Sequence, residues 1–195
     1  MLRTIALTLI FLLISLGGGI SSVWYTLNAN VGFGAIRIGV WTAFPQEGSN
    51  DADPYSVARR ARDAKLPLGR AVGLSFFANT DSDGQTLSGQ CNYQLVGNVP
   101  QARFWTIYPA SPSLEPLKTS AYRNAVLHSQ QLLRRQDSSF VISIGPDPAA
   151  GNWISVTQPN QMVFVLTLYD TQIASTVASA EREFPAIVNV GCRDE

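Results

Sequence analysis

The sequence predicts a mainly β protein: an antiparallel β-sandwich of jelly-roll type with one or two peripheral helices, preceded by one N-terminal transmembrane helix. Two observations lead to this prediction. From Val72 onward, short segments rich in β-branched and aromatic residues follow one another, and turn residues separate them. The start of the chain, in contrast, is a long apolar stretch with a single charged residue, Arg3.

Composition indicates one domain without a basic field. The 195 residues are 46% hydrophobic, which suffices for one filled core but not for two domains plus a membrane segment. Lys+Arg 14 and Asp+Glu 14 give a net charge of +0, so we expect no nucleic-acid partner. We divide the chain into a transmembrane anchor or signal segment (1–27), a linker (28–35) and an exported β-sandwich domain (36–195).

The N-terminal segment stays apolar over about 20 residues, enough for a helix to cross a ~30 Å hydrocarbon layer. Arg3 precedes it and the next positive residue is Arg37. The positive-inside rule then predicts a single-pass protein of the bacterial inner membrane, with its N-terminus in the cytoplasm and its domain in the periplasm. A cleaved signal peptide is the alternative, because Ile5–Leu16 fits an h-region. We favour the anchor, since apolar character continues to Trp24 and Tyr25.

The two cysteines, Cys91 and Cys192, both fall in the exported part. In an oxidising periplasm we expect them to form a disulfide that closes a loop of about 100 residues. Two separate buried thiols are the alternative.

The exported part begins with alternation typical of a strand with one buried face. The residues on that face are Ile36, Ile38, Val40 and Phe44. A loop over Gln46–Asp53 follows.

A helix is predicted next, because Asp53 can cap it, Pro54 suits its first position and Tyr55–Lys65 contain no breaker. We expect this helix to pack on the outside of the sandwich. Its small apolar face consists of Val57, Ala58, Ala61 and Ala64.

The same helix carries the one local basic cluster, Arg59, Arg60, Arg62 and Lys65, beside a single acid, Asp63. We interpret it first as a solvated face whose cations suit the C-terminal end of the helix dipole. The alternative is contact with anionic lipid headgroups or another anionic ligand.

The remaining strands are predicted from β-branched and aromatic runs bounded by turn residues. Their ranges are Val72–Asn79, Gln90–Gly97, Arg103–Tyr108, Ser139–Gly145, Asn152–Thr157, Met162–Tyr169 and Ala186–Val190. Asp81–Gly84 is a tight-turn signature, and we prefer that interpretation to a calcium loop. Ser120–Arg135 is expected to be a helix or an ordered loop, and Ile173–Glu183 a short helix.

Several short motifs follow one another along the exported part. They are Asp53-Pro54-Tyr55 with Ala58, Ala61 and Arg62; Asp81-Ser82-Asp83-Gly84 with Leu87, Gly89 and Tyr93; Ala102-Arg103-Phe104-Trp105-Thr106; Gly151-Asn152-Trp153; and Leu168-Tyr169-Asp170. In this order and spacing the sequence resembles the bacterial family known as domain of unknown function 1214, DUF1214. The resemblance implies a β-sandwich-like domain with no established activity. Longer members carry a second uncharacterised domain ahead of this one, where the present sequence has its membrane segment.

Aromatic rings in or beside strands supply the main binding hypothesis, a platform for sugar or lipid, although most are expected to pack in the core. In Asn152-Trp153 an amide and an indole can both donate hydrogen bonds to a bound oxygen, and arginines can add charge. The ligand-binding candidates are Asn152, Trp153, Trp105, Tyr93, Arg103 and Arg62.

No metal site is expected, because His128 is the sole histidine. No cofactor is expected either. We assign no catalytic residue. The favoured function is a membrane-tethered periplasmic binding or assembly module that docks on a separately encoded envelope protein. The alternative is an envelope enzyme, hydrolase-like, that acts on a glycan or lipid through paired acids among Asp81, Asp83 and Asp170.

Overall fold

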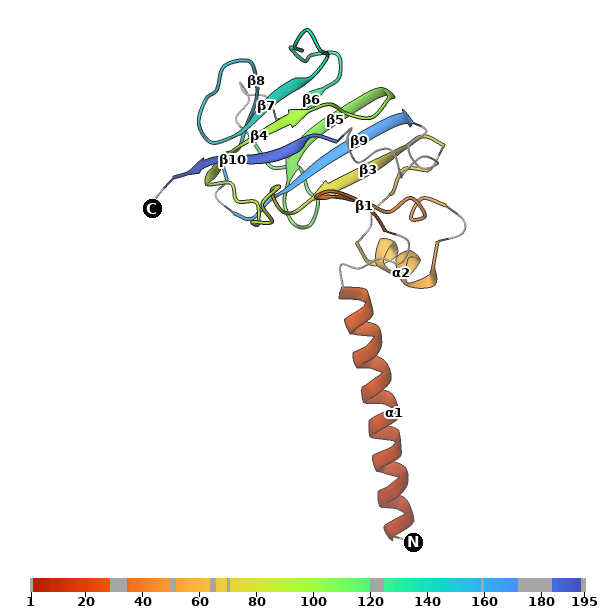
Figure 1. The fold of residues 1–195 in the computed structure, drawn as a ribbon. Coiled ribbons are helices and arrows are strands. Elements are labelled where there is room, and N and C mark those ends of the chain that lie inside the picture. Colours follow the sequence, from red (N-terminus) through yellow and green to blue (C-terminus); the bar gives the residue numbers. More distant parts are fainter. Residues whose placement is uncertain are drawn as a thin grey trace.

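The fold consists of one long N-terminal helix and a β-rich domain. The computed structural model describes residues 2–28, 35–49, 52–63, 66–69, 71–119, 125–158, 160–171 and 184–193. Helix α1 (Leu2–Asn28) stands away from the domain, and the shorter α2 (Pro54–Asp63) lies where the two meet (Figure 1). The strands are β1 (Ile36–Ile38), β2 (Trp41–Ala43), β3 (Gly73–Ala78), β4 (Cys91–Gly97), β5 (Ala102–Ala110), β6 (Leu127–His128), β7 (Phe140–Gly145), β8 (Asn152–Ser155), β9 (Val163–Thr171) and β10 (Ala186–Cys192).

The strands form two sheets, as predicted for a sandwich. One has the order β1-β2-β3-β9-β5-β6 and the other β10-β4-β7-β8. The seven long strands predicted from Val72 onward correspond to β3, β4, β5, β7, β8, β9 and β10, so this part of the prediction is confirmed. A strand from late in the sequence completes each sheet. β9 lies between β3 and β5 in the larger sheet, and β10 pairs with β4 in the smaller one.

One pair of strands departs from the expected antiparallel pattern. β7 and β8 run parallel, with Ile142 opposite Asn152. The link between them is residues 146–151, which is short for a parallel connection, and Gly151 in it has a φ of 84°. A glycine tolerates this left-handed conformation, so the chain can turn back beside the strand that it has just left.

The core lies between the two sheets, where rings from opposite sheets touch. Trp105 of β5 packs on Phe140 of β7 with ring centroids 5.3 Å apart. Tyr93 of β4 meets Phe164 of β9 edge to face at 5.8 Å. Contacts of this kind across the layers define a sandwich, in which the inner faces of both sheets are buried together.

The first predicted strand is wrong in its extent. Instead of one strand up to Phe44, the chain folds back at Gly39 and Val40, so that β1 and β2 form a hairpin with Ile38 opposite Trp41. Gly39 has a φ of 56°, and a two-residue hairpin loop of this kind requires a glycine at its first position. Apolar and polar residues can alternate along a hairpin as they do along a single strand, so the sequence pattern did not reveal the turn.

Helix α2 begins where the sequence predicts. The backbone N–H of Ser56 donates to Asp53 Oδ1 at 3.0 Å, the geometry of an N-cap. The predicted packing of its apolar face, however, is wrong for the described side chains: Val57, Ala58 and Ala61 are exposed. Ala64 lies outside the described residues.

Three further predictions concern the loops. Asp81–Gly84 forms the expected tight turn, because Asp81 Oδ1 accepts hydrogen bonds from the N–H groups of Asp83 (3.0 Å) and Gln85 (2.8 Å). The described part of Ser120–Arg135, residues 125–135, holds the short strand β6 and turns rather than a helix. The helix predicted at Ile173–Glu183 lies outside the described residues.

Candidate functional site

The end of β10 meets the start of β4 at the paired cysteines. Cys192 lies opposite Cys91 in the antiparallel register, and Gly191 lies opposite Asn92. The two sulfur atoms are at disulfide distance, and the cysteines are 101 positions apart in the sequence. This contact holds the C-terminal end of the described chain against the four-stranded sheet.

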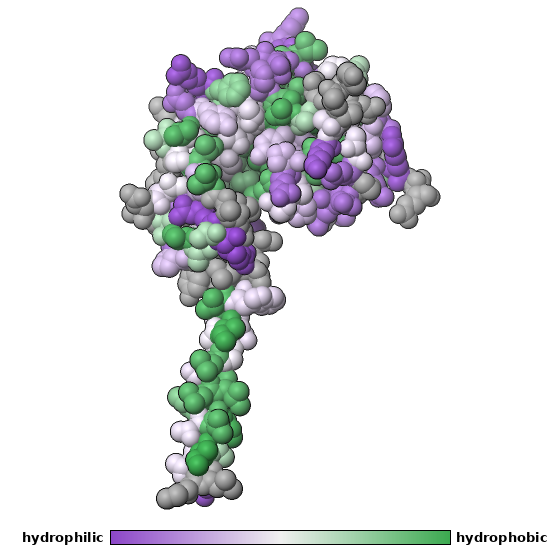
Figure 2. Space-filling view, turned by 180° about the vertical axis from the view of Figure 1, so that it is seen from behind, coloured by the Kyte–Doolittle hydropathy of each residue, from purple (hydrophilic) through white to green (hydrophobic). Residues whose placement is uncertain are grey.

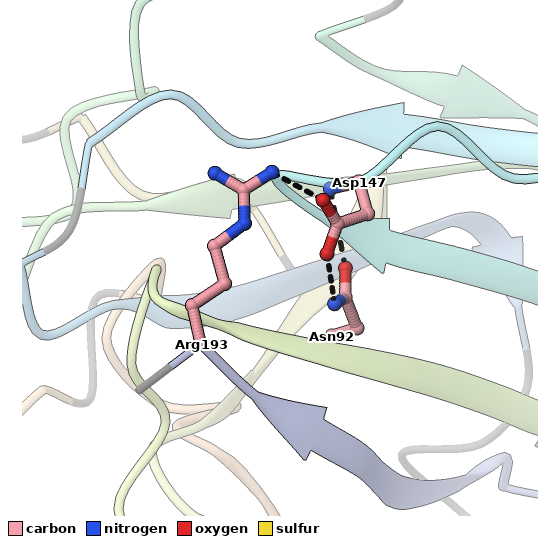
Figure 3. Close-up of polar contacts among 3 residues, drawn as sticks. All are labelled: Asn92, Asp147 and Arg193. Carbon is pink, nitrogen blue, oxygen red and sulfur yellow. Dashed lines mark hydrogen bonds and ion pairs between the residues drawn. The ribbon is translucent and has the colours of Figure 1, made fainter. Parts of the chain in front are cut away.

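Beside the disulfide, three polar side chains form a cluster, Asn92, Asp147 and Arg193 (Figure 3). Asn92 Nδ2 donates to Asp147 Oδ2 at 2.7 Å, and the backbone N–H of Asp147 donates back to Asn92 Oδ1 at 3.3 Å. The Arg193 guanidinium donates through one Nη to Asp147 Oδ1 and forms an ion pair there. Asp147 is therefore held by two side chains that follow directly after the two cysteines.

These bonds change the ionisation of the cluster. The hydrogen bond from Arg193, and after it that from Asn92, lowers the pKa of Asp147 below the ordinary 3.8. The same carboxylate raises the pKa of Arg193. Both side chains are about half exposed, at 56% for Arg193 and 47% for Asp147, so water screens their attraction. The ion pair thus fixes the position of the guanidinium more than it stabilises the fold.

Arg193 also forms part of the wall of an open hollow of about 550 Å³. Apolar atoms of two prolines and a valine make up much of the rest of the wall. The lining residues are Gly89, Gln90, Pro146, Pro148, Val156, Thr157 and Arg193.

Two glycines allow the chain segments around this hollow to approach closely. A Cβ atom on Gly89 would lie 1.8 Å from the backbone oxygen of Gln158. A Cβ atom on Gly145 would lie 2.3 Å from Asn92 Oδ1. Any larger residue at either position would push apart the segments that form the wall and the polar cluster.

The hollow combines a guanidinium donor with apolar walls. A guanidinium has five N–H donors, and only part of this capacity is used by Asp147. An oxygen acceptor on a ligand can therefore be bound by Arg193, while an apolar part of the ligand lies against Pro146, Pro148 and Val156.

Two of the six predicted ligand-binding residues lie in the core. Tyr93 is 2% exposed, and its hydroxyl accepts a hydrogen bond from the N–H of Ser88 at 3.0 Å. Burial raises the pKa of Tyr93. Trp105 is 3% exposed and packs on Phe140.

Asn152 is also buried, and its amide is fully used inside the protein. Its Nδ2 donates to the carbonyls of Leu133 (2.8 Å) and Val141 (3.0 Å), and its Oδ1 accepts from the N–H of Leu133 at 2.8 Å. This side chain therefore ties the loop before β7 to the edge strand β8. Trp153, next along β8, is half-buried.

The two arginines lie elsewhere. Arg103 is exposed on β5, with its guanidinium 4.0 Å from Asp170, and Arg62 lies on α2. None of the six predicted residues belongs to the described lining of the hollow. The structure does not bring them into one cleft, and their role in binding stays a prediction.

Sequence reasoning missed Asn92, Asp147 and Arg193 as a group. A signal for two of them was present, because Asn92 follows Cys91 and Arg193 follows Cys192. Residues next to paired cysteines become neighbours once the pairing is assumed. Asp147 sits between two prolines in the link from β7 to β8, and its place depends on the parallel pairing that was not predicted.

Two acids of the enzyme alternative, Asp81 and Asp170, lie beyond opposite ends of β3. Asp81 lies three residues beyond Ala78, the last residue of this strand, whereas the N–H of Asp170 donates to the carbonyl of Val72, just before its first residue. A six-residue strand is about 20 Å long, too far for a pair of acids that act on one bond. Among the described residues, moreover, no group of three or more His, Cys, Asp or Glu side chains could hold a metal ion.

Comparison with one solved structure shows a shared fold. The VPA0106 protein from Vibrio parahaemolyticus is similar with a TM-score of 0.56 and 18% identity, over 72% of this chain and 36% of that one. An uncharacterised protein from Burkholderia cenocepacia matches with a TM-score of 0.45 and 17% identity, over 89% of this chain and 40% of that one. The chain thus spans well under half the length of either protein. No curated protein matches its sequence significantly.

The family comparison covers the strands from β3 to β9. A family model described as a protein of unknown function, DUF1214, matches residues 72–173, just over half of the 195-residue chain. The matched region contains Asn92 and Asp147 and ends before Arg193. The chain therefore belongs to the DUF1214 family.

Proposed function

We propose that this protein is a membrane-tethered binding module of the bacterial cell envelope. Helix α1 anchors it in the inner membrane, the β-sandwich lies in the periplasm, and the hollow beside Arg193 receives the ligand or a segment of a separately encoded partner.

The observation that carries the proposal is the apolar surface of α1. Its segment Arg3–Tyr25 has a mean hydropathy of 2.1 over 23 residues, and none of that window is buried against the rest of the chain. At 1.5 Å per residue it is about 35 Å long, enough to cross a bilayer core of ~30 Å. Thirteen large apolar side chains between Ile5 and Tyr25 are exposed. At about 1.5 kcal/mol each, covering them with lipid gains roughly 20 kcal/mol.

Charge and the cysteine pair support the direction of insertion. Arg3 lies before the span, and no other basic residue follows until Arg37. The positive-inside rule keeps the Arg3 side in the cytoplasm. Cys91 and Cys192 at disulfide distance suit an oxidising compartment such as the periplasm.

The hollow supports binding rather than catalysis. It combines a positioned guanidinium with apolar walls, and the acids Asp81 and Asp170 lie apart from each other.

Topology is tested with alkaline phosphatase fused after Glu195, because this enzyme is active only after export. We expect an active fusion, and an inactive one when residues 2–28 are deleted. An inactive full-length fusion that is stably produced would contradict the proposed orientation.

Binding in the hollow is tested by photo-crosslinking in cells. A photoreactive residue replaces Thr157, which is exposed and lines the hollow, or Leu133, which is 68% exposed and does not. We expect a covalent product at position 157 alone, and its loss in the Arg193→Ala variant. Equal products from both positions, or products indifferent to Arg193→Ala, would show that the hollow is not the binding site.

A further inference from the structure

The orientation of α2 is the reverse of that of an ordinary surface helix. Ser56 is 4% exposed and Arg60, one turn later, is half-buried, so this side of the helix is covered by other parts of the chain. Val57, Ala58 and Ala61 face outward. A helix that packs on a sheet normally buries its apolar face and exposes its polar one. The outward apolar face of α2 therefore suits an environment that is itself partly apolar.

The position of α2 identifies that environment. Cα atoms of α2 lie within 8 Å of Cα atoms of α1, and Figure 1 shows α2 near the end of α1 that is closer to the domain. The candidate span ends at Tyr25, so this end of α1 lies at the bilayer surface. In the space-filling view, apolar and strongly hydrophilic surfaces lie side by side at the base of the domain, directly above α1 (Figure 2).

Charge indicates which bilayer component α2 contacts. Its sequence contains arginines at positions 59, 60 and 62 against one acid, Asp63. Arg62 is exposed, whereas Arg60 lies on the covered side of the helix. Leu66, just beyond the helix, is 98% exposed and adds a large apolar side chain to the same segment. Basic and apolar residues together on one short helix are typical of helices that lie in the plane of an anionic membrane surface. A favourable helix dipole explains the arginines but not the outward Val57.

We propose that α2 lies on the anionic lipid headgroups of the membrane that α1 crosses, and so holds the sandwich down on the bilayer surface. The inference rests on the proposed anchoring by α1. With two attachments, through α1 and α2, the domain keeps one face toward the lipid instead of rotating freely about the axis of α1.

The test uses the full chain reconstituted in vesicles with headgroup spin-labelled lipid, which quenches fluorophores near the surface. One variant carries a fluorophore at Val57→Cys and the matched control carries it at Leu133→Cys, which is 68% exposed and belongs to the loop before β7. The native cysteines are already paired and do not react. Vesicles contain either phosphatidylcholine alone or phosphatidylcholine with phosphatidylglycerol.

We expect stronger quenching at position 57 than at 133, and stronger quenching in the vesicles with phosphatidylglycerol. Arg62→Gln should reduce the equilibrium constant of this contact about fivefold, and high salt should weaken it further. Equal quenching at 57 and 133 would overturn the inference while leaving anchoring intact. Quenching at 57 that is indifferent to phosphatidylglycerol would also overturn it. Failure of the chain to stay with the vesicles after alkaline washing would refute the anchor itself.

Discussion

Removal of the disulfide should lower the free energy of unfolding of the domain by an amount set by the length of the loop that the bond closes. The substitution of choice is Cys192→Ser, because Cys192 is exposed, whereas Cys91 is 7% exposed and a serine there would bury a hydroxyl group. The bond joins residues 101 positions apart. In the chain-entropy model, closing a loop of that length raises the free energy of the unfolded chain by about 4.7 kcal/mol at 25 °C.

This free energy converts into a melting temperature. A domain of about 160 residues unfolds with an entropy near 0.34 kcal/mol/K, so each kcal/mol moves Tm by about 3 °C. Cys192→Ser should therefore lower Tm by about 14 °C. The assay is thermal unfolding of the full chain in detergent, followed by near-ultraviolet circular dichroism, which reports the packing of the core tryptophans.

Reductant supplies the matched control. It should lower the Tm of the wild type to that of the variant and leave the variant unchanged. A wild type whose Tm falls by less than about 4 °C on complete reduction would refute the reasoning, because the loop closed by the bond would then cost the unfolded chain little.

Three further predictions concern single residues. Since hydrogen bonds lower the pKa of Asp147, its contribution to stability is complete above the unfolded value near 3.8 and is lost as the pH falls through the lower folded value. Asp147→Asn should thus flatten the decline of Tm below about pH 4, and an unchanged decline would contradict this. Asn152→Ala removes three hydrogen bonds and should lower the free energy of unfolding, measured with denaturant, by about 2 to 3 kcal/mol. A variant as stable as the wild type would show that the backbone groups of Leu133 and Val141 find other hydrogen-bond partners. Gly89→Ala, whose Cβ meets a backbone oxygen at 1.8 Å, should cost about 3 kcal/mol, against about 1 kcal/mol for Gly84→Ala, where only the φ of 84° is unfavourable. An equal loss of unfolding free energy in the two glycine variants would mean that the backbone at Gly89 shifts to make room for the added Cβ atom.

The sequence was most informative where a local pattern decides the structure. The seven strands from Val72 onward were found because runs of β-branched and aromatic residues end at turn residues. Asp53 and Pro54 marked the start of α2, because capping depends on residues adjacent in the chain. The apolar length of α1 followed from composition alone.

Long-range arrangement was harder to predict. The hairpin at Gly39 was missed because two short strands alternate like one longer strand. Tyr93 and Trp105 were proposed for a binding surface, yet strand alternation does not say which face is inside until the second sheet is placed. The cluster of Asn92, Asp147 and Arg193 depends on three separate segments, and no spacing in the sequence joins the aspartate to the other two.

The late position of β9 and β10 has a consequence for how the protein is made. β9 is an interior strand of its sheet and pairs with β3, about ninety residues earlier, while β10 pairs with β4 across a similar separation. Neither sheet can be completed until nearly the whole polypeptide has left the ribosome. Pairings so distant in the chain form slowly, because the ends of a long loop must first be brought together. A nascent chain halted before Val163 would lack the strand on which both halves of the larger sheet assemble.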